Sequence, residues 1–440
     1  MRVAAVLAVV LFTCACTSDP PMPSPAAPVG SHASPASATP TSLPITPPAP
    51  ASASASPAPS GPAAATPPSR FAASTPSNDA SLALHRALRA DKGNLFFSGA
   101  SVRTALAMTA LGAKGPTLEE MTKAFGLPSD PAKSTAAAKA DAQAWRVAAG
   151  KAELVVANRL WLDRSAALEA SFASMAKDGF GAAPEIVDFG KAPEPSRARV
   201  NAWVTDTTKG RIKDLLPPGS VDALTRLVLT NAIYFKGRWA TAFDKAQTKD
   251  GAFHADAGSV TVPMMHRIGE MAYASNDEVE LVQLDYKDST LALLVALPRP
   301  SAKLADMESE ISGGEVDAWA KSLATRKVDL TMPRWSFSWG RSIKSELGAM
   351  GMKTAFTDRA DFTGISRQPK DLYVTDVFHK AFVLVEESGT EAAAATGVVM
   401  ATRALLQTTT VRVDRPFLFF VRDKKTGEIL FEGRVANPRT

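Results

Sequence analysis

The chain has 440 residues, enough for one large domain or two ordinary ones. Hydrophobic residues make up 45% and charged residues 21%, which is typical of a soluble globular protein, and the formal net charge is only +5. Because no run of Lys and Arg forms a basic stripe, the composition argues against nucleic acid or another polyanion as a partner.

The first 16 residues have the layout of a secretory signal peptide. One arginine precedes an apolar run from Val3 to Phe12, which is too short to span a bilayer, and small residues and cysteines follow. The segment resembles a bacterial lipobox, in which a cysteine behind a small residue is lipidated. Cys16 fits that pattern best, although Thr13 stands where leucine is usual. We therefore expect an exported bacterial protein, either a lipoprotein anchored to the cell envelope through Cys16 or, with an ordinary signal peptide, an extracellular one.

Residues 17–76 form a segment rich in Pro, Ala and Ser that we expect to be disordered. Positions 20–69 contain no Asp, Glu, Lys or Arg, and 17 of the 32 prolines lie between Pro20 and Pro76. Such a segment buries too little apolar surface to offset the entropy of ordering, and its prolines favour an extended chain. It reads either as a semi-rigid stalk or as a leader without a role. No cysteine follows it, so the domain at 77–440 must be stable without a disulfide.

The domain begins with helices and continues mainly with strands. Helical spacing of apolar residues predicts helices over 78–93, 101–115, 117–127, 196–209, 315–323 and 342–351. In the first of these, Asn78 or Asp79 is the expected N-cap and Gly93 the stop. Apolar and β-branched runs predict strands over 154–163, 226–239, 260–266, 271–274, 279–284, 289–298, 327–339 and 381–387, and a hairpin over 415–435. Few βαβ units occur, so the fold class is α+β with several sheets.

The sequence contains no recognisable catalytic or metal-binding motif. The five histidines are scattered, without HExxH or Cys/His metal spacing, and neither a GxSxG elbow nor a phosphate-binding glycine loop occurs. The adjacent carboxylates at Glu119–Glu120 and Glu386–Glu387 read as solvated charge. We therefore predict that the protein is not an enzyme and needs no metal or organic cofactor, with a secreted enzyme whose triad assembles from distant residues as the alternative.

One segment, EESGTEAAAATGVVMATRALLQ at 386–407, fits two structures. The small residues of GTEAAAAT suit a helix, whereas the β-branched and apolar residues of TGVVMAT suit a strand. Arg403 is the single basic residue between positions 391 and 411. The segment is either an Ala-rich surface linker or a stretch that changes conformation.

Four stretches resemble signatures of the serpin superfamily of serine-protease inhibitors. They are NLFFSGASV at 94–102, LTNAIYFKGRW at 229–239, VFHKAFVLVEESGTEAAAAT at 377–396 and DRPFLFFVRDKKTGEILFEGRVANP at 414–438. The resemblance extends from about residue 77 to the C-terminus. It implies a serpin fold with about three β-sheets, eight to nine helices and an exposed reactive-centre loop.

The resemblance also implies conformational roles for single residues. The positions that close the centre of the main sheet, called the shutter, are matched by Ser98, Ser101, Asn231 and His379. Trp239 matches the tryptophan below the start of loop insertion, called the breach. Taken alone, each of these residues also reads as a satisfied polar group of the core. Gly99 stands where the family usually has proline, which would loosen the backbone there.

In serpins a segment such as 386–407 is the reactive-centre loop, which inserts into the main sheet as a new strand after a protease has cleaved it. Insertion turns every second side chain into the core. From Thr390 the inward positions are small or apolar and carry no charge: Thr390, Ala392, Ala394, Thr396, Val398 and Met400. Among the outward positions Glu391, Ala393 and Ala395, only Glu391 is charged. Together with Glu387 and the flexible Gly389, residues 390–396 form the predicted hinge.

Family spacing places the bait residue at the seventeenth position when Glu387 is counted as the first, which is Arg403, so Arg403–Ala404 is the predicted scissile bond. Arginine suits trypsin-like proteases, whose specificity pocket holds a carboxylate. The resemblance therefore implies a monomeric inhibitor that traps a trypsin-like serine protease as a covalent acyl complex. It implies no nucleic acid and a membrane contact only through an N-terminal lipid. The alternative is a non-inhibitory serpin that acts as a carrier or binding module.

Overall fold

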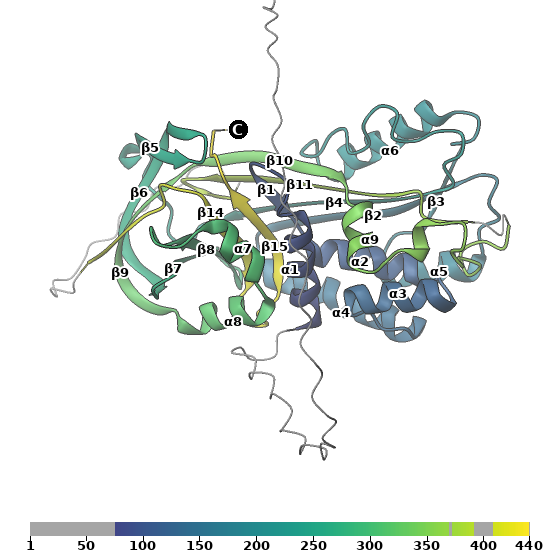
Figure 1. Ribbon diagram of the computed structural model, residues 1–440, viewed down its shortest axis with the longest axis horizontal. Helices are drawn as coiled ribbons and strands as arrows, with labels where there is room; N and C mark the ends of the chain where they lie inside the picture. Colours follow the sequence, from purple (N-terminus) through teal and green to yellow (C-terminus); the bar gives the residue numbers. More distant parts are fainter. Residues whose placement is uncertain (1–74, 369–371, 391–407, 440) are drawn as a thin grey trace, which may run out of the picture. The chain divides into compact units, whose positions relative to one another are not determined.

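The computed structural model describes residues 75–368, 372–390 and 408–439 (Figure 1). The predicted signal peptide, Cys16 and nearly all of the predicted stalk lie outside the described residues. Thr75 and Pro76, which the sequence assigned to the stalk, are the N-cap and the first residue of helix α1. No helix in the described part of the chain is long and apolar enough to cross a membrane.

Nine α-helices occur in the described residues, as the family resemblance implied. They are α1 (Pro76–Leu88), α2 (Gly99–Ala110), α3 (Gly115–Phe125), α4 (Pro131–Ala149), α5 (Ala170–Phe180), α6 (Pro193–Thr207), α7 (Leu304–Glu310), α8 (Gly313–Ser322) and α9 (Lys344–Ala349). Two short 3₁₀ turns, η1 (Lys245–Gln247) and η2 (Thr354–Phe356), lie in connections.

Helix α1 begins and ends earlier than the sequence predicted. Its N-cap is Thr75, whose hydroxyl accepts a hydrogen bond from the Asn78 backbone N–H, and its last residue is Leu88. The Asn78 side chain instead binds the backbone of the C-terminal hairpin: it donates to the Gly427 carbonyl and accepts from Ile429 N. A residue that suits an N-cap by type therefore serves here as a tertiary link.

The described strands form two sheets, which agrees with the predicted α+β class. The central sheet has six strands in the order β10 (Trp335–Ser342), β11 (Asp376–Glu386), β12 (Gly389–Thr390), β4 (Leu227–Arg238), β2 (Glu153–Asp163) and β3 (Glu185–Val187). The second sheet has nine strands in the order β1 (Leu95–Phe97), β15 (Ile429–Val435), β14 (Phe417–Asp423), β8 (Leu291–Pro298), β7 (Val279–Asp285), β6 (Gly258–Ser275), β9 (Ala324–Pro333) and β13 (Thr409–Arg412), with β5 (Lys249–Ala255) paired to β6.

Several predicted strands have boundaries that differ from those in the structure. The segments 260–266 and 271–274 belong to one continuous strand, β6, because its backbone ladder with β9 runs without interruption from Met264 to Tyr273. The predicted single strand at 327–339 is two strands in different sheets, β9 and β10. The break falls at Pro333, the last residue of β9, which has no N–H to continue a ladder.

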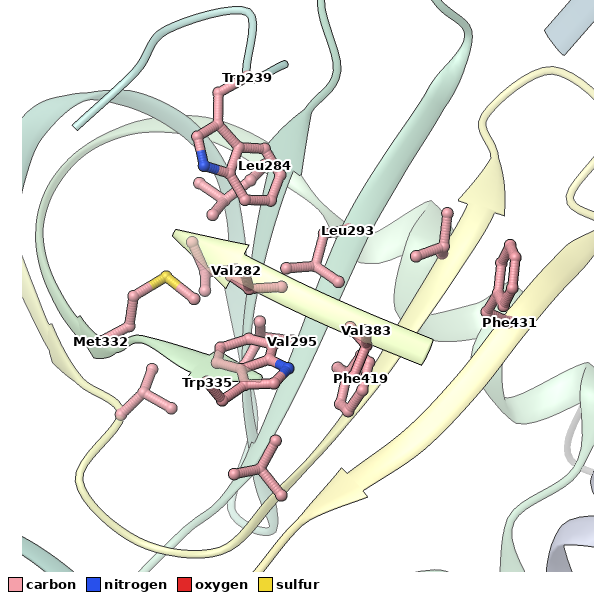
Figure 2. Close-up of a cluster of buried hydrophobic side chains, with 14 of the residues drawn as sticks. Trp239, Val282, Leu284, Leu293, Val295, Met332, Trp335, Val383, Phe419 and Phe431 are labelled. Atoms are coloured by element: carbon pink, nitrogen blue, oxygen red, sulfur yellow. The ribbon is translucent and has the colours of Figure 1, made fainter. Parts of the chain in front are cut away.

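The largest hydrophobic core fills the space between the two sheets. Figure 2 shows side chains from both sheets converging there, among them Val383 of the central sheet and Val295 and Phe419 of the nine-stranded sheet. Trp335 packs edge-on or tilted against Phe417 and Phe419, with ring centroids 5.3 and 5.4 Å away. Such aromatic pairs contribute stability beyond that of apolar burial alone. Here they join β10 of the central sheet to β14 of the nine-stranded sheet.

The central sheet is covered on both faces, which explains its almost continuously apolar strands. Helix α2 packs against one face, in a core that also takes in Leu229 of β4 and Val377 of β11. Helix α6 covers the opposite face (Figure 1). There Val200 and Val204 share a core with Phe378 of β11. The core on the α2 face and the core on the α6 face therefore each contain residues of β4 and of β11.

Candidate functional site

The centre of the central sheet is a parallel pair, β4 and β11. The two strands are in register from Val228 opposite Asp376 to Tyr234 opposite Phe382. Beyond this stretch, at one end of the sheet, β12 lies between them. Its residues Gly389 and Thr390 pair antiparallel with β11 and also antiparallel with β4. The two residues of β12 thus occupy the place of a strand between β4 and β11.

Thr390 is fixed at this position by its side chain. It is only 3% exposed, and its hydroxyl lies 2.7 Å from the hydroxyl of Tyr286. Burial raises the pKa of Tyr286, so the phenol stays protonated and can donate to Thr390. The Tyr286 ring stacks on Trp239 at a centroid distance of 4.8 Å. The inward side chain of the predicted hinge therefore rests on an aromatic pair.

Trp239 and the residues after it bind the turn between β11 and β12. The Trp239 ring N–H donates to the Glu386 carbonyl at 2.9 Å, and its backbone N–H donates to the Ser388 carbonyl at 3.1 Å. The backbone N–H of Phe243 donates to the Glu387 carbonyl at 2.8 Å. Three consecutive carbonyls of the turn are thus held by one short segment of chain.

The Glu387 carboxylate is buried in the same region, not solvated as its sequence context suggested. It is 2% exposed and accepts a 2.8 Å hydrogen bond from the Thr248 hydroxyl. The Arg334 guanidinium lies 3.6 Å from the same oxygen, and the other carboxylate oxygen has no hydrogen-bond partner among the described residues. A buried carboxylate with this few partners depends strongly on each of them.

Gly389 has a backbone conformation that excludes other residues. Its φ is +150°, and a Cβ atom there would lie 2.1 Å from the Gly237 carbonyl oxygen of β4. The absence of a side chain lets β12 approach β4 closely enough to pair with it. The glycine of the predicted hinge therefore serves close backbone packing.

The four predicted shutter residues lie together in one buried hydrogen-bonded chain. His379 of β11 contacts the Asn231 side-chain oxygen of β4 through Nδ1 and accepts from the Ser98 backbone N–H through Nε2 at 3.3 Å. Because Nε2 accepts, Nδ1 carries the proton. The Asn231 amide group donates to Ser101 Oγ at 2.6 Å and to the Asn158 side-chain oxygen of β2. This chain joins β11, β4 and β2 across the centre of the sheet.

The Ser98 side chain also links the shutter to a helix end. Its hydroxyl caps α2 by accepting from the Ser101 N–H at 3.1 Å. Gly99 is more constrained than the sequence suggested, since a Cβ atom there would lie 1.9 Å from the Ser81 hydroxyl and 2.6 Å from its Cα. The glycine is required because Ser81 of α1 occupies the space that a proline ring would need.

On the face covered by α6, a second side-chain contact joins β11 to the connection that leads from α6 into β4. Lys380 of β11 donates from Nζ to the Lys213 carbonyl at 2.7 Å and to the Asp214 carbonyl at 3.4 Å, both in the connection from α6 to β4. Asp214 has a φ of +50°, an unfavourable conformation for a residue with a side chain. Opposite Lys380 on β10 stands Gly340, where a Cβ atom would lie 2.5 Å from the lysine side chain.

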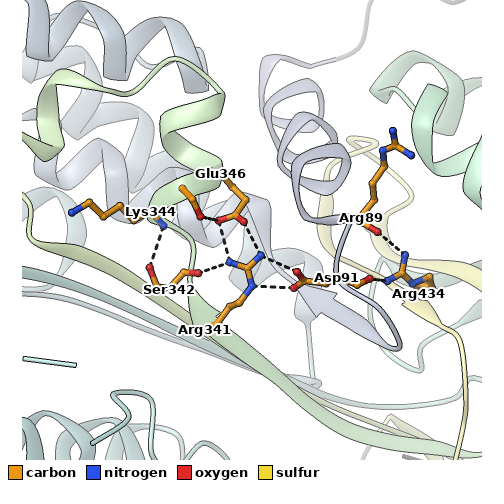
Figure 3. A network of polar contacts seen from close by, with 8 residues as sticks. Arg89, Asp91, Arg341, Ser342, Lys344, Glu346 and Arg434 are labelled. Atoms are coloured by element: carbon orange, nitrogen blue, oxygen red, sulfur yellow. Dashed lines mark hydrogen bonds and ion pairs between the residues drawn. The ribbon is translucent and has the colours of Figure 1, made fainter. Parts of the chain in front are cut away.

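The other side of β11 is held by an ion network at β10. Arg341 donates to both oxygens of Asp91, at 3.0 and 3.1 Å, and to Glu346 of α9 (Figure 3). Arg341 lies directly opposite His379 in the ladder between β10 and β11. The network ties this half of the central sheet to the connection between α1 and β1.

The remaining predicted site residues lie outside the described part of the chain. These are the bait residues Arg403 and Ala404 and the hinge positions Glu391, Ala392, Ala393, Ala394, Ala395 and Thr396. Sequence reasoning in turn missed Tyr286, Thr248, Arg334 and Asn158. The one available signal was Asn158, a polar residue inside the apolar run of β2. Among the described residues, no three His, Cys, Asp or Glu side chains gather as they would around a metal ion.

Comparisons with known proteins agree with this geometry. The family model described as "Serpin (serine protease inhibitor)" matches residues 75–438. The chain is 37% identical over 360 residues to an uncharacterized serpin-like protein of Thermococcus kodakarensis, covering 81% of this chain and 83% of that one. It is 37% identical over 358 residues to antithrombin-III of the mouse, covering 79% and 77%. The crystal structure of Serpin48 from the insect Tenebrio molitor superposes with a TM-score of 0.74 at 28% identity, covering 82% of this chain and 97% of that one.

We predict that acid weakens the shutter through His379. Burial lowers the pKa of His379 to about 3, against 6.5 for an exposed histidine, so the unfolded chain binds one more proton than the folded one between these pH values. Stability should therefore fall as pH decreases below 6.5, by about 1.4 kcal/mol per pH unit. Thermal unfolding at pH 7 and pH 5, compared between the wild type and His379→Gln, measures this contribution.

The comparison between variants is needed because other groups act in the opposite direction. Burial raises the pKa of Glu432 to about 8, so that its contribution makes the fold more stable as pH falls from about 8 to 4.5. The difference between wild type and variant cancels that contribution. If His379→Gln kept the full pH dependence of the wild type, the shutter histidine would not be its source.

We also predict that Glu387→Lys opens the turn between β11 and β12. The substitution removes the acceptor for Thr248 and places a cation beside Arg334, which should cost on the order of 3 kcal/mol. The thermal midpoint should fall by several degrees, and the turn should become sensitive to proteolysis. The matched control is Glu119→Lys, the same charge change at an exposed position of α3. Equal midpoints for the two variants would contradict the role assigned to Glu387.

Proposed function

The chain belongs to the serpin family, and from this premise we propose that it inhibits trypsin-like serine proteases by trapping them after cleavage of the Arg403–Ala404 bond. The observation that carries the proposal is β12, whose two residues pair antiparallel with both β4 and β11. The predicted loop follows β12 in the sequence, and β12 itself runs antiparallel to both neighbours, which is the direction that further insertion requires.

The proposed reaction is an acyl transfer to the protease that stops at the acyl-enzyme ester, before water hydrolyses it. The serine oxygen of the protease attacks the Arg403 carbonyl carbon, the bond to the Ala404 nitrogen breaks, and the nitrogen leaves as an amine with the proton of the serine hydroxyl. The ester keeps the protease on the N-terminal half of the loop. At roughly 3.3 Å per residue, about fourteen inserted residues carry the protease some 45 Å along the sheet.

The inward residues of the loop suit the space that insertion would fill. The position taken by Thr390 lies beside Tyr286 and the closely packed Gly237, so that small side chains enter first. Ala392, Ala394 and Thr396 would follow on the same face. A non-inhibitory carrier remains the second candidate from the sequence, but none of these inward positions carries the charge or bulk that would stop insertion.

We further propose that the protein is exported and acts as a monomer outside the cytoplasm. The support is the sequence of the first 16 residues, with lipidation at Cys16 as the finer proposal. Metabolic labelling with a radioactive fatty acid, comparing wild type with Cys16→Ser, tests the lipid. Label retained by the variant would contradict attachment at Cys16.

The inhibitory function predicts a covalent complex with trypsin. Equimolar trypsin and serpin should give one band on a denaturing gel at the sum of the two masses, and peptide mapping should place the acyl bond at Arg403. Arg403→Ala removes the side chain that the carboxylate of the specificity pocket binds, so trypsin inhibition should fall at least a hundredfold. Undiminished inhibition by this variant would mean that another residue is the bait.

The insertion step predicts a different result for Thr390→Arg. Thr390 already occupies the buried site next to Tyr286, and a charged side chain cannot take its place. The strand that insertion extends would then not form, so cleavage should occur without trapping and the variant should become a substrate. Glu391→Arg is the matched control because position 391 points outward in the same alternation, and it should still form the complex. Complex formation by Thr390→Arg at the wild-type ratio would refute the assigned inward face.

A further inference from the structure

A large cavity is lined by five chain segments, none of which belongs to a strand of the central sheet. It has a volume of about 910 Å³, within the range of pockets that hold small organic molecules. Its walls come from the connection between α1 and β1, the turn between β5 and β6, the segment from β8 into α7, the residues before β14 and the end of β15. None of these residues takes part in the shutter, the breach or the turn at β12.

The cavity is lined largely by small apolar residues. Its wall includes Ala255, Pro298, Ala302, Ala305, Pro416 and Ala436. Short side chains leave the space open, and they offer no hydrogen-bond donors or acceptors beyond the backbone. Such a wall favours the apolar body of a ligand over a polar one.

The polar groups of the wall that are buried already have partners. Arg434 is 6% exposed, and it donates to both oxygens of Glu308 at 2.8 and 2.9 Å and to the backbone carbonyl of Gly93 at 2.8 Å. Asp91 is occupied by Arg341 (Figure 3). Because these buried charged groups are paired with one another or with backbone carbonyls, none of them needs a ligand as a partner.

The remaining charges at the cavity are mainly positive. Arg89, Lys92 and Lys303 are exposed and form no ion pair with any residue that the structure describes. Figure 3 shows the Arg89 guanidinium pointing away from the network to which its backbone carbonyl belongs. The single unpaired carboxylate in the wall, within the same described residues, is that of Asp256. Three unpaired cations against one carboxylate make the mouth attractive to an anion.

We infer that this cavity binds an amphipathic anion, a molecule with an apolar body and one carboxylate or similar head group. The body covers the alanines and prolines of the wall, and the head lies among Arg89, Lys92 and Lys303. This site gives the protein a small-molecule binding function separate from its proposed action on proteases.

Isothermal titration of the domain with sodium decanoate, below its critical micelle concentration, tests the inference. Decanoate should bind one to one in the micromolar range. Acetate, which has only the head group, should show no binding. Decyltrimethylammonium has the same body with a cationic head, and it should bind at least tenfold more weakly. The absence of saturable binding, or equal affinity for decanoate and the cation, would overturn the inference.

Variants locate the site. Lys92→Glu with Lys303→Glu should weaken decanoate binding at least tenfold, whereas Lys123→Glu with Lys321→Glu makes the same change of net charge at exposed positions elsewhere and should leave it unchanged. Ala305→Trp, at an exposed position of α7, should fill the cavity and abolish binding without lowering the thermal midpoint. Equal losses in the cavity and control pairs, or full binding by Ala305→Trp, would place decanoate elsewhere.

A functional readout separates the two roles. The Lys92 and Lys303 double variant should form the trypsin complex at the wild-type rate, because the cavity shares no residue with the turn or the shutter. If the wild type failed to trap trypsin, the decanoate result would still stand. If decanoate did not bind, the trypsin result would still stand.

Discussion

The structure depends on how the facing edges of β4 and β11 satisfy their backbone hydrogen bonds. Each edge needs a partner, since an unpaired buried N–H or C=O costs free energy comparable to a lost hydrogen bond. Over seven residue pairs the strands satisfy each other, and at one end they are satisfied by β12. The same groups can be satisfied by a longer strand between them. The proposed function therefore gives the sheet two arrangements in which these backbone groups are paired, and the segment after β12 would decide between them.

Side chains on both faces bias the choice toward the closed arrangement. On the α2 face, His379, Asn231 and Asn158 connect three strands through buried hydrogen bonds that exist only at the present spacing. On the α6 face, Lys380 ties β11 to the connection that leads into β4. At the end of the sheet where β12 lies, contacts of Tyr286 and Glu387 fix the turn between β11 and β12. These contacts are polar and, apart from Tyr286, their residues lie outside the apolar core between the two sheets, so their loss would leave that core in place.

The sequence predicted the parts of this account that follow from local pattern or from family signatures. The apolar run of β4, the alternation after Thr390 and the glycine at position 389 were all visible. The partners that hold the site were not, because they come from distant parts of the chain: Tyr286 lies 104 positions before Thr390, and Thr248 lies 139 before Glu387. Such contacts depend on strand register, which no local pattern specifies. Helix α4 was also missed, because its many alanines give little contrast between its faces.

In the proposed function, the loop relaxes the molecule when it joins the sheet. The most direct measurement is the thermal unfolding midpoint before and after a single proteolytic cut within residues 391–407, with both fragments kept in solution. The account predicts that the cut protein unfolds at a clearly higher temperature, because the released segment satisfies the backbone of β4 and β11 along its whole length. An unchanged or lower midpoint after the cut would contradict it.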